Sequence, residues 1–309
     1  MVRSENRPGR KWRRRGCALA PLAVALAIGL AGCGGKDAAP AKTFTISAIP
    51  DQDPEKLQRL YGGVASYLAQ ELGVPVVYRP VTDYTASVTA FKVGELDLVW
   101  YGGLTGVQAR LQVPDAHAIA QRDIDDQFHC VFIANQATDI TDLAGLKGHT
   151  FTFGSEASTS GRLMPQYFLA QAGIKLDDFK GQNGFSGSHD KTIKLVAAGA
   201  FEAGVVNEQV WKQYVQNHAP ELAHLRVIWT SPPFHDYHWV LHPSVAGRFG
   251  TDFPDRVKAA LLKLNAANPQ DKPVLDLFGA TRFIATDDAN YREIEAIGTQ
   301  IGLIVPRAK

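Results

Sequence analysis

The sequence predicts an α/β protein of two lobes, each a doubly wound sheet, joined by two crossing strands. Segments that alternate like strands take turns with segments of helical periodicity, and this pattern starts again after residue 135. Such alternation implies a parallel sheet covered by helices on both faces. The chain has 309 residues. The 277 residues that would follow a 32-residue signal peptide are compatible with one large domain or with two lobes.

The first lobe is expected to open with a strand at 44–50, followed by a long helix. Asp53 is a typical N-cap, Pro54 suits the first helical position, and Gly73 ends the apolar periodicity. Asp83 is expected to cap a second helix in the same way. The other elements expected here are strands at 74–78, 96–100 and 116–120 and helices at 84–94 and 104–111.

The second lobe is expected to repeat the pattern between two crossing strands. A strand at 128–135 leads into it, and a strand at 226–229 returns the chain to the first lobe. We therefore expect lobe 1 to comprise 43–134 and 230–309, and lobe 2 to comprise 135–229. The other elements expected in lobe 2 are strands at 150–153, 183–185 and 203–206 and helices at 159–172, 188–198 and around 210–214. The tail of the chain, in lobe 1, is expected to add helices at 254–264 and 289–301.

The first 32 residues are expected to be a signal peptide outside the fold. A basic stretch up to Arg15 precedes an apolar stretch at 17–31, which is too short to span a membrane. It ends in Leu-Ala-Gly-Cys33, which resembles a bacterial lipobox and implies that Cys33 carries lipid. Residues 33–42 then form the lipidated cysteine and a polar linker. An ordinary signal peptide or an uncut anchor helix is the alternative, and the choice between Sec and twin-arginine export stays open.

The charge and the cysteine content argue against a nucleic-acid-binding protein and against a disulfide or CxxC metal site. The chain has 32 basic and 31 acidic residues. Cleavage would remove seven basic residues and one acidic residue, which leaves a net charge of −5. A mildly acidic chain without a basic run argues against a nucleic-acid partner. Of three cysteines, only Cys130 would remain unmodified, so no intrachain disulfide and no CxxC metal site is expected.

Three consecutive hydroxyl residues mark the start of the helix expected at 159–172. Ser158, Thr159 and Ser160 lie where the first N–H groups of the helix have no partner inside it, and Gly161 follows. These N–H groups, the hydroxyls and the helix dipole together would suit an oxyanion. A single N-cap is the simpler reading, but it needs only one hydroxyl. The run of three therefore favours an anion site.

Four more polar loops follow predicted strands. In doubly wound sheets, ligands bind outside the carboxyl ends of the strands, near helix N-termini. Convergence of these loops on the hydroxyl run predicts a ligand site between the lobes. The loops are 83–84, 101–103, 186–189 and 207–209.

Three motifs resemble one known family. Trp100-Tyr101-Gly102, Ser158–Gly161 with Pro165, and Ser186–Asp190 are similar to the phosphate/phosphite/phosphonate-binding proteins of bacterial ABC transporters, over about 43–303. The amino-acid sequence around 47–54 and 229–239 is most similar to a branch of the family described as selenate-binding. The resemblance implies a two-lobed type 2 periplasmic binding protein, monomeric and without a cofactor. It would close on a small oxyanion and serve an ABC permease and its ATPase.

The resemblance also implies which residues bind the ligand. In this family a Ser/Thr loop, tyrosines and a histidine hold the anion, and we expect His189 to act as a protonated donor. Aminophosphonate binders add an acidic residue where this chain has Gln209 beside Glu208. The ligand contacts implied are Tyr84, Tyr101, Ser158, Thr159, Ser160 and His189. The candidates for lining the cleft are Asn207, Glu208, Gln209, Asp236 and Tyr237.

Two other functions were weighed against anion binding. His235 and His238, with His242 beyond, could indicate a zinc-binding transport protein, although no Cys or Glu cluster accompanies them. Residues 184–188 lack the last glycine of a nucleophile elbow, so an enzyme is not expected. The chain also contains no Walker A motif, so we do not expect it to hydrolyse ATP.

Overall fold

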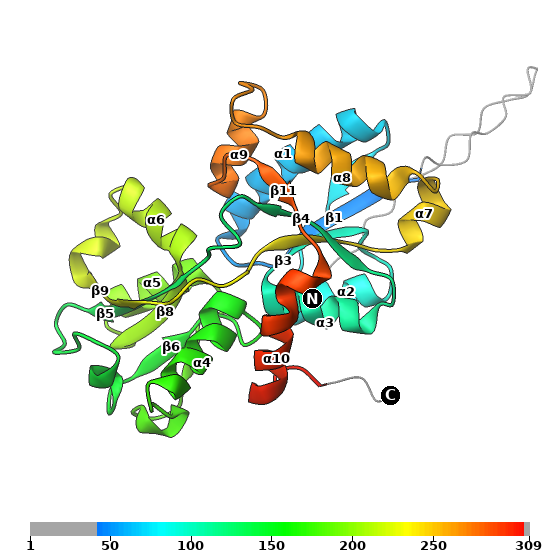
Figure 1. Ribbon diagram of the computed structural model, residues 1–309. Helices are drawn as coiled ribbons and strands as arrows, with labels where there is room; N and C mark the ends of the chain where they lie inside the picture. Colours follow the sequence, from blue (N-terminus) through cyan, green and yellow to red (C-terminus); the bar gives the residue numbers. More distant parts are fainter. Residues whose placement is uncertain (1–41, 306–309) are drawn as a thin grey trace, which may run out of the picture. The chain divides into compact units, whose positions relative to one another are not determined.

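Strands and helices alternate through residues 42–305, the part of the chain that the computed structural model describes (Figure 1). The strands form two separate sheets. The predicted signal peptide, the lipidated Cys33 and all of its linker except Lys42 lie outside the described residues. None of the helices within 42–305 is both long and apolar enough to cross a membrane.

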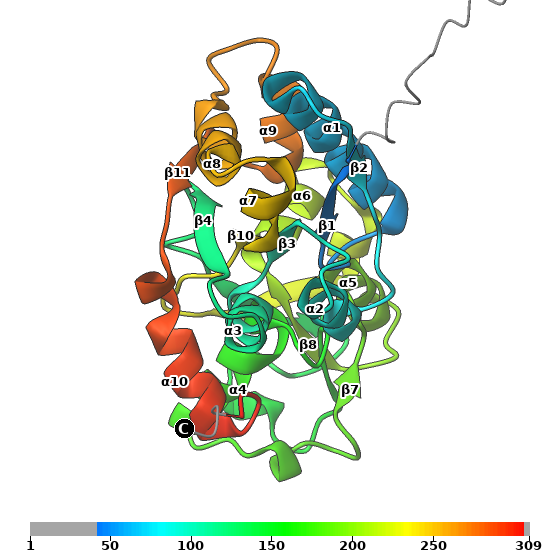
Figure 2. The ribbon, with the colours of Figure 1, turned by 90° about the vertical axis from the view of Figure 1, so that its right-hand side faces the viewer.

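The first sheet has six strands in the order β11-β4-β10-β3-β1-β2. In Figure 2 its central strands lie between α1, α8 and α9 on one side and α2 and α3 on the other. The strands are β1 (Phe44–Ala48), β2 (Val76–Tyr78), β3 (Leu98–Tyr101), β4 (His117–Arg122), β10 (His238–Leu241) and β11 (Phe283–Ala285). The helices are α1 (Pro54–Leu72), α2 (Tyr84–Lys92), α3 (Gly103–Gln112), α7 (Ser244–Phe249), α8 (Phe253–Lys263), α9 (Lys272–Phe278) and α10 (Arg292–Ile301).

The second sheet has five strands in the order β7-β6-β8-β5-β9. A π-helical turn at Thr159–Leu163 follows the second of its strands along the chain and leads directly into α4. The strands are β5 (Cys130–Asn135), β6 (Phe151–Phe153), β7 (Gly184–Phe185), β8 (Ala203–Asn207) and β9 (Leu225–Thr230). The helices are α4 (Met164–Gln171), α5 (His189–Ala197) and α6 (Glu208–Gln216).

The local signals read from the sequence are confirmed at the helix ends. Asp53 accepts hydrogen bonds from the N–H groups of Glu55 and Lys56, and Gly73 ends α1 in the left-handed conformation. Asp83 accepts from the N–H of Ala86 at the start of α2. The α/β fold class and its two-lobed arrangement are therefore as expected.

The sheets are mixed, which corrects the expectation of purely parallel sheets. β1 runs parallel to β2 and β3, and β6 runs parallel to β7 and β8. β10, however, is antiparallel to β3 and β4, and β5 is antiparallel to β8 and β9. β11 is also antiparallel, to β4. β5 and β10 each follow a connection without a helix, and parallel neighbours need a long crossover connection. The two connections, 123–129 and 231–237, lie side by side through a bridge between Phe128 and Phe234.

Four elements were not predicted: α7, α9, β10 and β11. Each has seven residues or fewer. β10 is buried along its whole length, so it lacks the apolar–polar alternation of a half-buried strand. Short elements of this kind are specified by the neighbours they pack against more than by their own sequence.

Candidate anion-binding site

The three hydroxyls of Ser158, Thr159 and Ser160 have different surroundings. Ser158 Oγ accepts a hydrogen bond from the N–H of Gly161 at 3.0 Å and caps the helix. Thr159 Oγ1 accepts from the N–H of Leu104, in the first lobe, at 2.9 Å. Ser160 Oγ is buried and has no hydrogen-bond partner among the described residues. The run therefore contains one cap, one contact between lobes and one free hydroxyl.

His189 is placed at the start of α5 with its ring against the same loop. A Cβ built on Gly161 would lie 3.0 Å from the Cε1 atom of this ring. His189 is fully buried, which lowers its pKa to about 3. Its Nδ1 accepts from the backbone N–H of Asn207 at 3.2 Å, so the proton of the neutral ring is assigned to Nε2.

This state of His189 corrects the expectation of a protonated donor. Desolvation disfavours the imidazolium ion, so the ring is neutral over the whole physiological pH range. Its Nε2–H still donates, and this atom has no acceptor within the described part of the chain. Anion binding should therefore not depend on a titration of His189 near its ordinary pKa.

Asp236 brings a carboxyl group to the same place from the second connection between the lobes. Its Oδ1 accepts from the N–H of Gly103 at 3.0 Å, while Oδ2 has no partner in residues 42–305. Burial raises the pKa of Asp236 to about 7, although the N–H of Gly103 and the hydroxyls of Ser160 and Thr159 act to lower it. The Ser160 hydroxyl is close enough to influence Asp236 without forming a well-directed hydrogen bond.

The two tyrosines expected to bind the ligand are in different situations. Tyr84 is 2% exposed, and its hydroxyl has no hydrogen-bond partner among the described residues. The hydroxyl of Ser158 is close enough to lower the pKa of Tyr84. Burial and then the charge of Asp51 raise that pKa well above its usual value, so the phenol is a neutral donor. Tyr101 instead donates to the carbonyl of Ser87 at 2.9 Å inside the first lobe. The structure thus brings Tyr84, and not the Tyr101 hydroxyl, to the loop.

Four unpartnered polar atoms therefore surround the hydroxyl loop. They are three donors, on Tyr84, Ser160 and His189, and one carboxylate oxygen, on Asp236. All four residues are 2% exposed or less. Leaving a buried polar group without a partner costs about 1–3 kcal/mol, so four together indicate a place built for a polar ligand.

The residues expected to line the cleft have other partners. Asn207 caps α6 and donates from Nδ2 to the hydroxyl of Tyr237 at 2.9 Å. Glu208 forms an ion pair with Lys212 and accepts from the N–H of His129. Gln209 contacts Arg122 and the carbonyl of Phe278. None of these three side chains points a free polar atom at the loop among the described residues.

Two buried residues near the site were missed by the sequence analysis. Asp51 follows β1, and its Oδ2 accepts from the hydroxyl of Tyr237 at 2.8 Å. Burial raises the pKa of Asp51 to about 6. Arg122 ends β4 and lies 4.9 Å from the ring of Tyr237. Asp51 stands at the carboxyl end of a strand, and Asp125 lies three residues after Arg122, so both offered a local signal. The contacts of Arg122 with Tyr237 and Gln209 had none.

A hollow of about 440 Å³ opens beside this site between residues of both lobes. Thr82 and Asp83 line it from the first lobe, and Ser155, Ser188 and Lys191 line it from the second. These residues adjoin Tyr84, Ser158 and His189 in sequence. The hollow therefore borders the segments that carry the candidate site.

Residues 46–291 match the family described as ABC transporter, phosphonate, periplasmic substrate-binding protein. A Prochlorococcus marinus protein described as a probable ABC transporter phosphite binding protein, PhnD1, is 45% identical over 270 residues, covering 85% of this chain and 91% of that protein. The chain belongs to this family. The structure of the P. marinus PhnD1 in complex with methylphosphonate superposes with a TM-score of 0.83 and 46% identity, over 85% of this chain and 99% of that one.

More distant members of the family share the fold. The phosphonates-binding periplasmic protein of Escherichia coli is 24% identical over 85% of this chain and 80% of its own length. A binding-protein component of an ABC phosphonate transporter from Pseudomonas aeruginosa superposes with a TM-score of 0.74 at 21% identity, over 83% of this chain and 85% of that one. The chain is thus a periplasmic substrate-binding protein of an ABC transporter, as the sequence motifs implied. None of these relatives is described as binding selenate.

The histidines considered as zinc ligands are in contact with other side chains of the first lobe instead. His238 stacks on Tyr291, with ring centroids 3.8 Å apart, and its pKa is lowered well below the usual value by burial. His235 makes an edge-on contact with the same Tyr291 ring, and His242 forms a hydrogen bond with Ser244. Within 42–305 no group of three or more His, Cys, Asp or Glu side chains is placed to hold a metal ion. Nothing in the structure or in the relatives supports a zinc transport protein.

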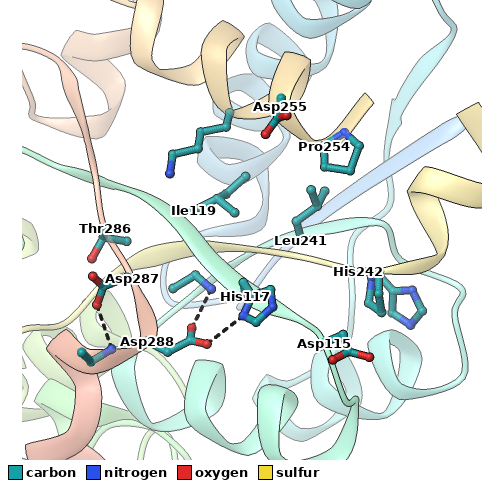
Figure 3. Close-up of a pocket in the computed structure, with 14 residues that line it drawn as sticks. Asp115, His117, Ile119, Leu241, His242, Pro254, Asp255, Thr286, Asp287 and Asp288 are labelled. Carbon is teal, nitrogen blue, oxygen red and sulfur yellow. Dashed lines mark hydrogen bonds and ion pairs between the residues drawn. The ribbon is translucent and has the colours of Figure 1, made fainter. Parts of the chain in front are cut away.

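A second hollow, of about 550 Å³, lies wholly in the first lobe (Figure 3). Ile119, Leu241 and Pro254 line it together with Asp115, His117 and Asp288. His117 and Asp288 are joined by a hydrogen bond of 3.0 Å. No residue predicted to bind the ligand lines this hollow, so it is separate from the hydroxyl loop.

Proposed function

We propose that this substrate-binding protein captures a small phosphonate or phosphite through Tyr84, Ser158, Thr159, Ser160, His189 and Asp236. The observation that carries the proposal is the set of three unpartnered donors around one unpartnered carboxylate oxygen. P. marinus PhnD1 is described as a probable phosphite-binding protein, and its structure contains methylphosphonate. Both ligands are tetrahedral anions of the size that such a cluster suits.

Asp236 favours an anion that still carries a proton. A phosphonate or phosphite monoanion has a P–OH group that can donate to Asp236 Oδ2, while its other oxygens accept from Tyr84, Ser160 and His189. Sulfate and selenate carry no proton at neutral pH, so an ionised Asp236 would repel them. The selenate branch of the family is therefore disfavoured by this residue.

Aminophosphonates are disfavoured for a different reason. A ligand ammonium group would need a free carboxylate near the start of α6. Glu208 is held by Lys212 and by the N–H of His129, and residue 209 is a glutamine bonded to Arg122. Recruiting Glu208 for a ligand ammonium group would cost its ion pair with Lys212, so the exchange would bring little net gain and an uncharged or absent substituent fits better.

Capture is proposed to occur by closure of the lobes about the connections 123–129 and 231–237. Hydrogen bonds between the lobes support this proposal. The N–H of His189 donates to the carbonyl of Asp51 at 3.0 Å, and Thr159, Asn207 and Gln209 form further bonds from the second lobe to the first lobe or to the connection. These connections would set the lobe boundaries near 122 and 238 in lobe 1 and near 130 and 230 in lobe 2. The closed protein would then dock on an ABC permease driven by an ATPase.

The proposal describes binding without catalysis. Ser160 would need a free base beside it to become a nucleophile. The Asp236 carboxyl group lies beside it but is proposed to hold the P–OH group of the ligand. The Nδ1 of His189 already accepts from Asn207, and its Nε2 carries the ring proton. Phosphorus NMR of methylphosphonate incubated with the protein should therefore show an unchanged compound.

Calorimetric titration tests the choice of ligand. The protein should bind methylphosphonate and phosphite and should bind sulfate and selenate weakly. Sulfate should bind only when Asp236 is protonated, whereas a phosphonate monoanion should bind only when Asp236 is ionised. The ratio of phosphonate to sulfate affinity should thus rise about tenfold per pH unit from 5.5, until the free phosphonate loses its last proton. Selenate or zinc binding more tightly than methylphosphonate, or a ratio that does not change with pH, would contradict the proposal.

We also propose that Cys33 anchors the protein to the membrane through lipid, with no other membrane contact. The lipobox-like Leu-Ala-Gly-Cys33 motif supports this. Cys33→Ser should abolish incorporation of labelled palmitate and release the protein or leave its signal peptide uncut. Cys130→Ser, which changes a buried cysteine, is the matched control and should be labelled normally. Label retained by Cys33→Ser would rule out the lipid anchor.

A further inference from the structure

The side chain of Gln209, in the second lobe, packs against Arg122, Phe278 and Gly279 of the first lobe, beside the connection 123–129. We call the space between these three residues the notch. Gln209 lies in the first turn of α6 and is 8% exposed. Its Oε1 accepts from Arg122 Nη1, and its Nε2 donates to the carbonyl of Phe278 at the end of α9. One amide thus satisfies one donor and one acceptor of the opposite lobe.

The notch exists because of a glycine. Gly279 ends α9 in the left-handed conformation, with φ of 63°. A Cβ at this position would lie 2.7 Å from Gln209 Nε2, closer than real Cβ atoms approach other atoms. Any other residue would therefore displace the Gln209 side chain, besides straining the backbone.

Arg122 is held in place without Gln209. Asp125 accepts from its Nε at 2.9 Å and from its Nη2 at 2.6 Å. The rings of Trp100, Phe128 and Tyr237 lie within 5.5 Å of the guanidinium carbon. Its Nη1 also donates to the carbonyl of Phe278 at 2.8 Å, so the group stays satisfied when Gln209 withdraws. The first lobe therefore offers a preformed receptor for one amide side chain.

We propose that Gln209 is a positioning residue, a latch that holds the closed form of the protein without touching the ligand. The inference rests on the proposed capture of an anion by lobe closure. Opening the lobes would separate Gln209 from Arg122 and Phe278, whereas every other partner of Arg122 belongs to the first lobe or to the connection. The latch forms whenever the lobes close, with or without an anion between them, so it favours the closed form and slows release of the anion.

Stopped-flow binding of methylphosphonate tests the latch. Gln209→Ala should raise the dissociation rate about tenfold and leave the association rate within twofold, as expected for a lost charge-assisted hydrogen bond. Gln216→Ala, an exposed glutamine on the same helix, is the matched control and should change neither rate. An unchanged dissociation rate in Gln209→Ala would overturn the latch.

A double-mutant cycle separates the latch from a loss of stability. Gly279→Ala should also raise the dissociation rate, because the new Cβ excludes Gln209. In a Gln209→Ala background the same change should have no further effect on that rate, although backbone strain lowers the melting temperature in both backgrounds. Additive effects on the dissociation rate would show that the notch does not act through Gln209.

Failure of the proposed function can be told apart from failure of the latch. If the wild-type protein binds none of the anions tested, the proposed function is wrong. Small-angle X-ray scattering then decides the latch, since Gln209→Ala should have a larger radius of gyration than the wild type. An equal radius would overturn the latch in that case.

Discussion

The double variant Thr159→Ala/Ser160→Ala is expected to bind methylphosphonate at least about 100-fold more weakly than the wild type. Ser160 supplies an unpartnered hydroxyl, and a hydrogen bond to a charged group contributes about 1.5–3 kcal/mol. Thr159 accepts the N–H of Leu104 from the other lobe, so its loss weakens closure as well. Isothermal titration calorimetry measures the effect directly.

The fold of this double variant should be intact. Ser158 retains its bond to the N–H of Gly161 and continues to cap the helix. Ser155→Ala, in the same loop, is the matched control and should bind the anion normally. Wild-type affinity in the double variant would mean that the hydroxyl run only caps the helix and that the anion binds elsewhere.

Asp236→Asn is expected to reverse the preference among anions. Asp236 Oδ1 accepts the N–H of Gly103, which would fix the amide oxygen of an asparagine there and turn its NH₂ toward the loop. A donor would then replace the only acceptor among the four unpartnered atoms. The ratio of methylphosphonate to sulfate affinity at pH 7.5 should fall by about 100-fold, which corresponds to about 2.7 kcal/mol.

The pH dependence of this variant provides a second readout. The carboxyl group that titrates near 7 is gone, so sulfate affinity should no longer fall as pH rises from 6 to 8.5. Asp83→Asn removes a neighbouring charge but keeps a good N-cap for α2, and it should preserve the wild-type preference. A variant that still prefers methylphosphonate, with unchanged pH dependence, would show that Asp236 does not select the ligand.

Much of the fold could be predicted because its signals are local. The Asp53 and Asp83 caps, the Gly73 stop and the start of α5 at His189 each depend on residues a few positions apart. The hydroxyl run was also visible in the sequence, together with the helix that it begins. Local signals of this kind survive without knowledge of the tertiary structure.

The surroundings of the candidate site could not be predicted in the same way. Asp236 and Gly103 are 133 positions apart, and Arg122 and Gln209 are 87 apart. Patterns that span a few neighbouring residues cannot show that positions so far apart in the chain are in contact. The same limit applies to Tyr101, whose hydroxyl donates to the carbonyl of Ser87, and to Gln209, which binds Arg122 and Phe278 of the other lobe.

The sequence by itself determined the alternation of strands and helices, the position of the hydroxyl loop and the family, since these follow from patterns along the chain. Only the tertiary structure decided which strands run antiparallel, which polar atoms are left without partners, and how the site is protonated. His189 is neutral and Asp236 titrates near 7 because both are buried, and burial is a property of the folded chain. The choice between a protonated and an unprotonated anion depends on that burial.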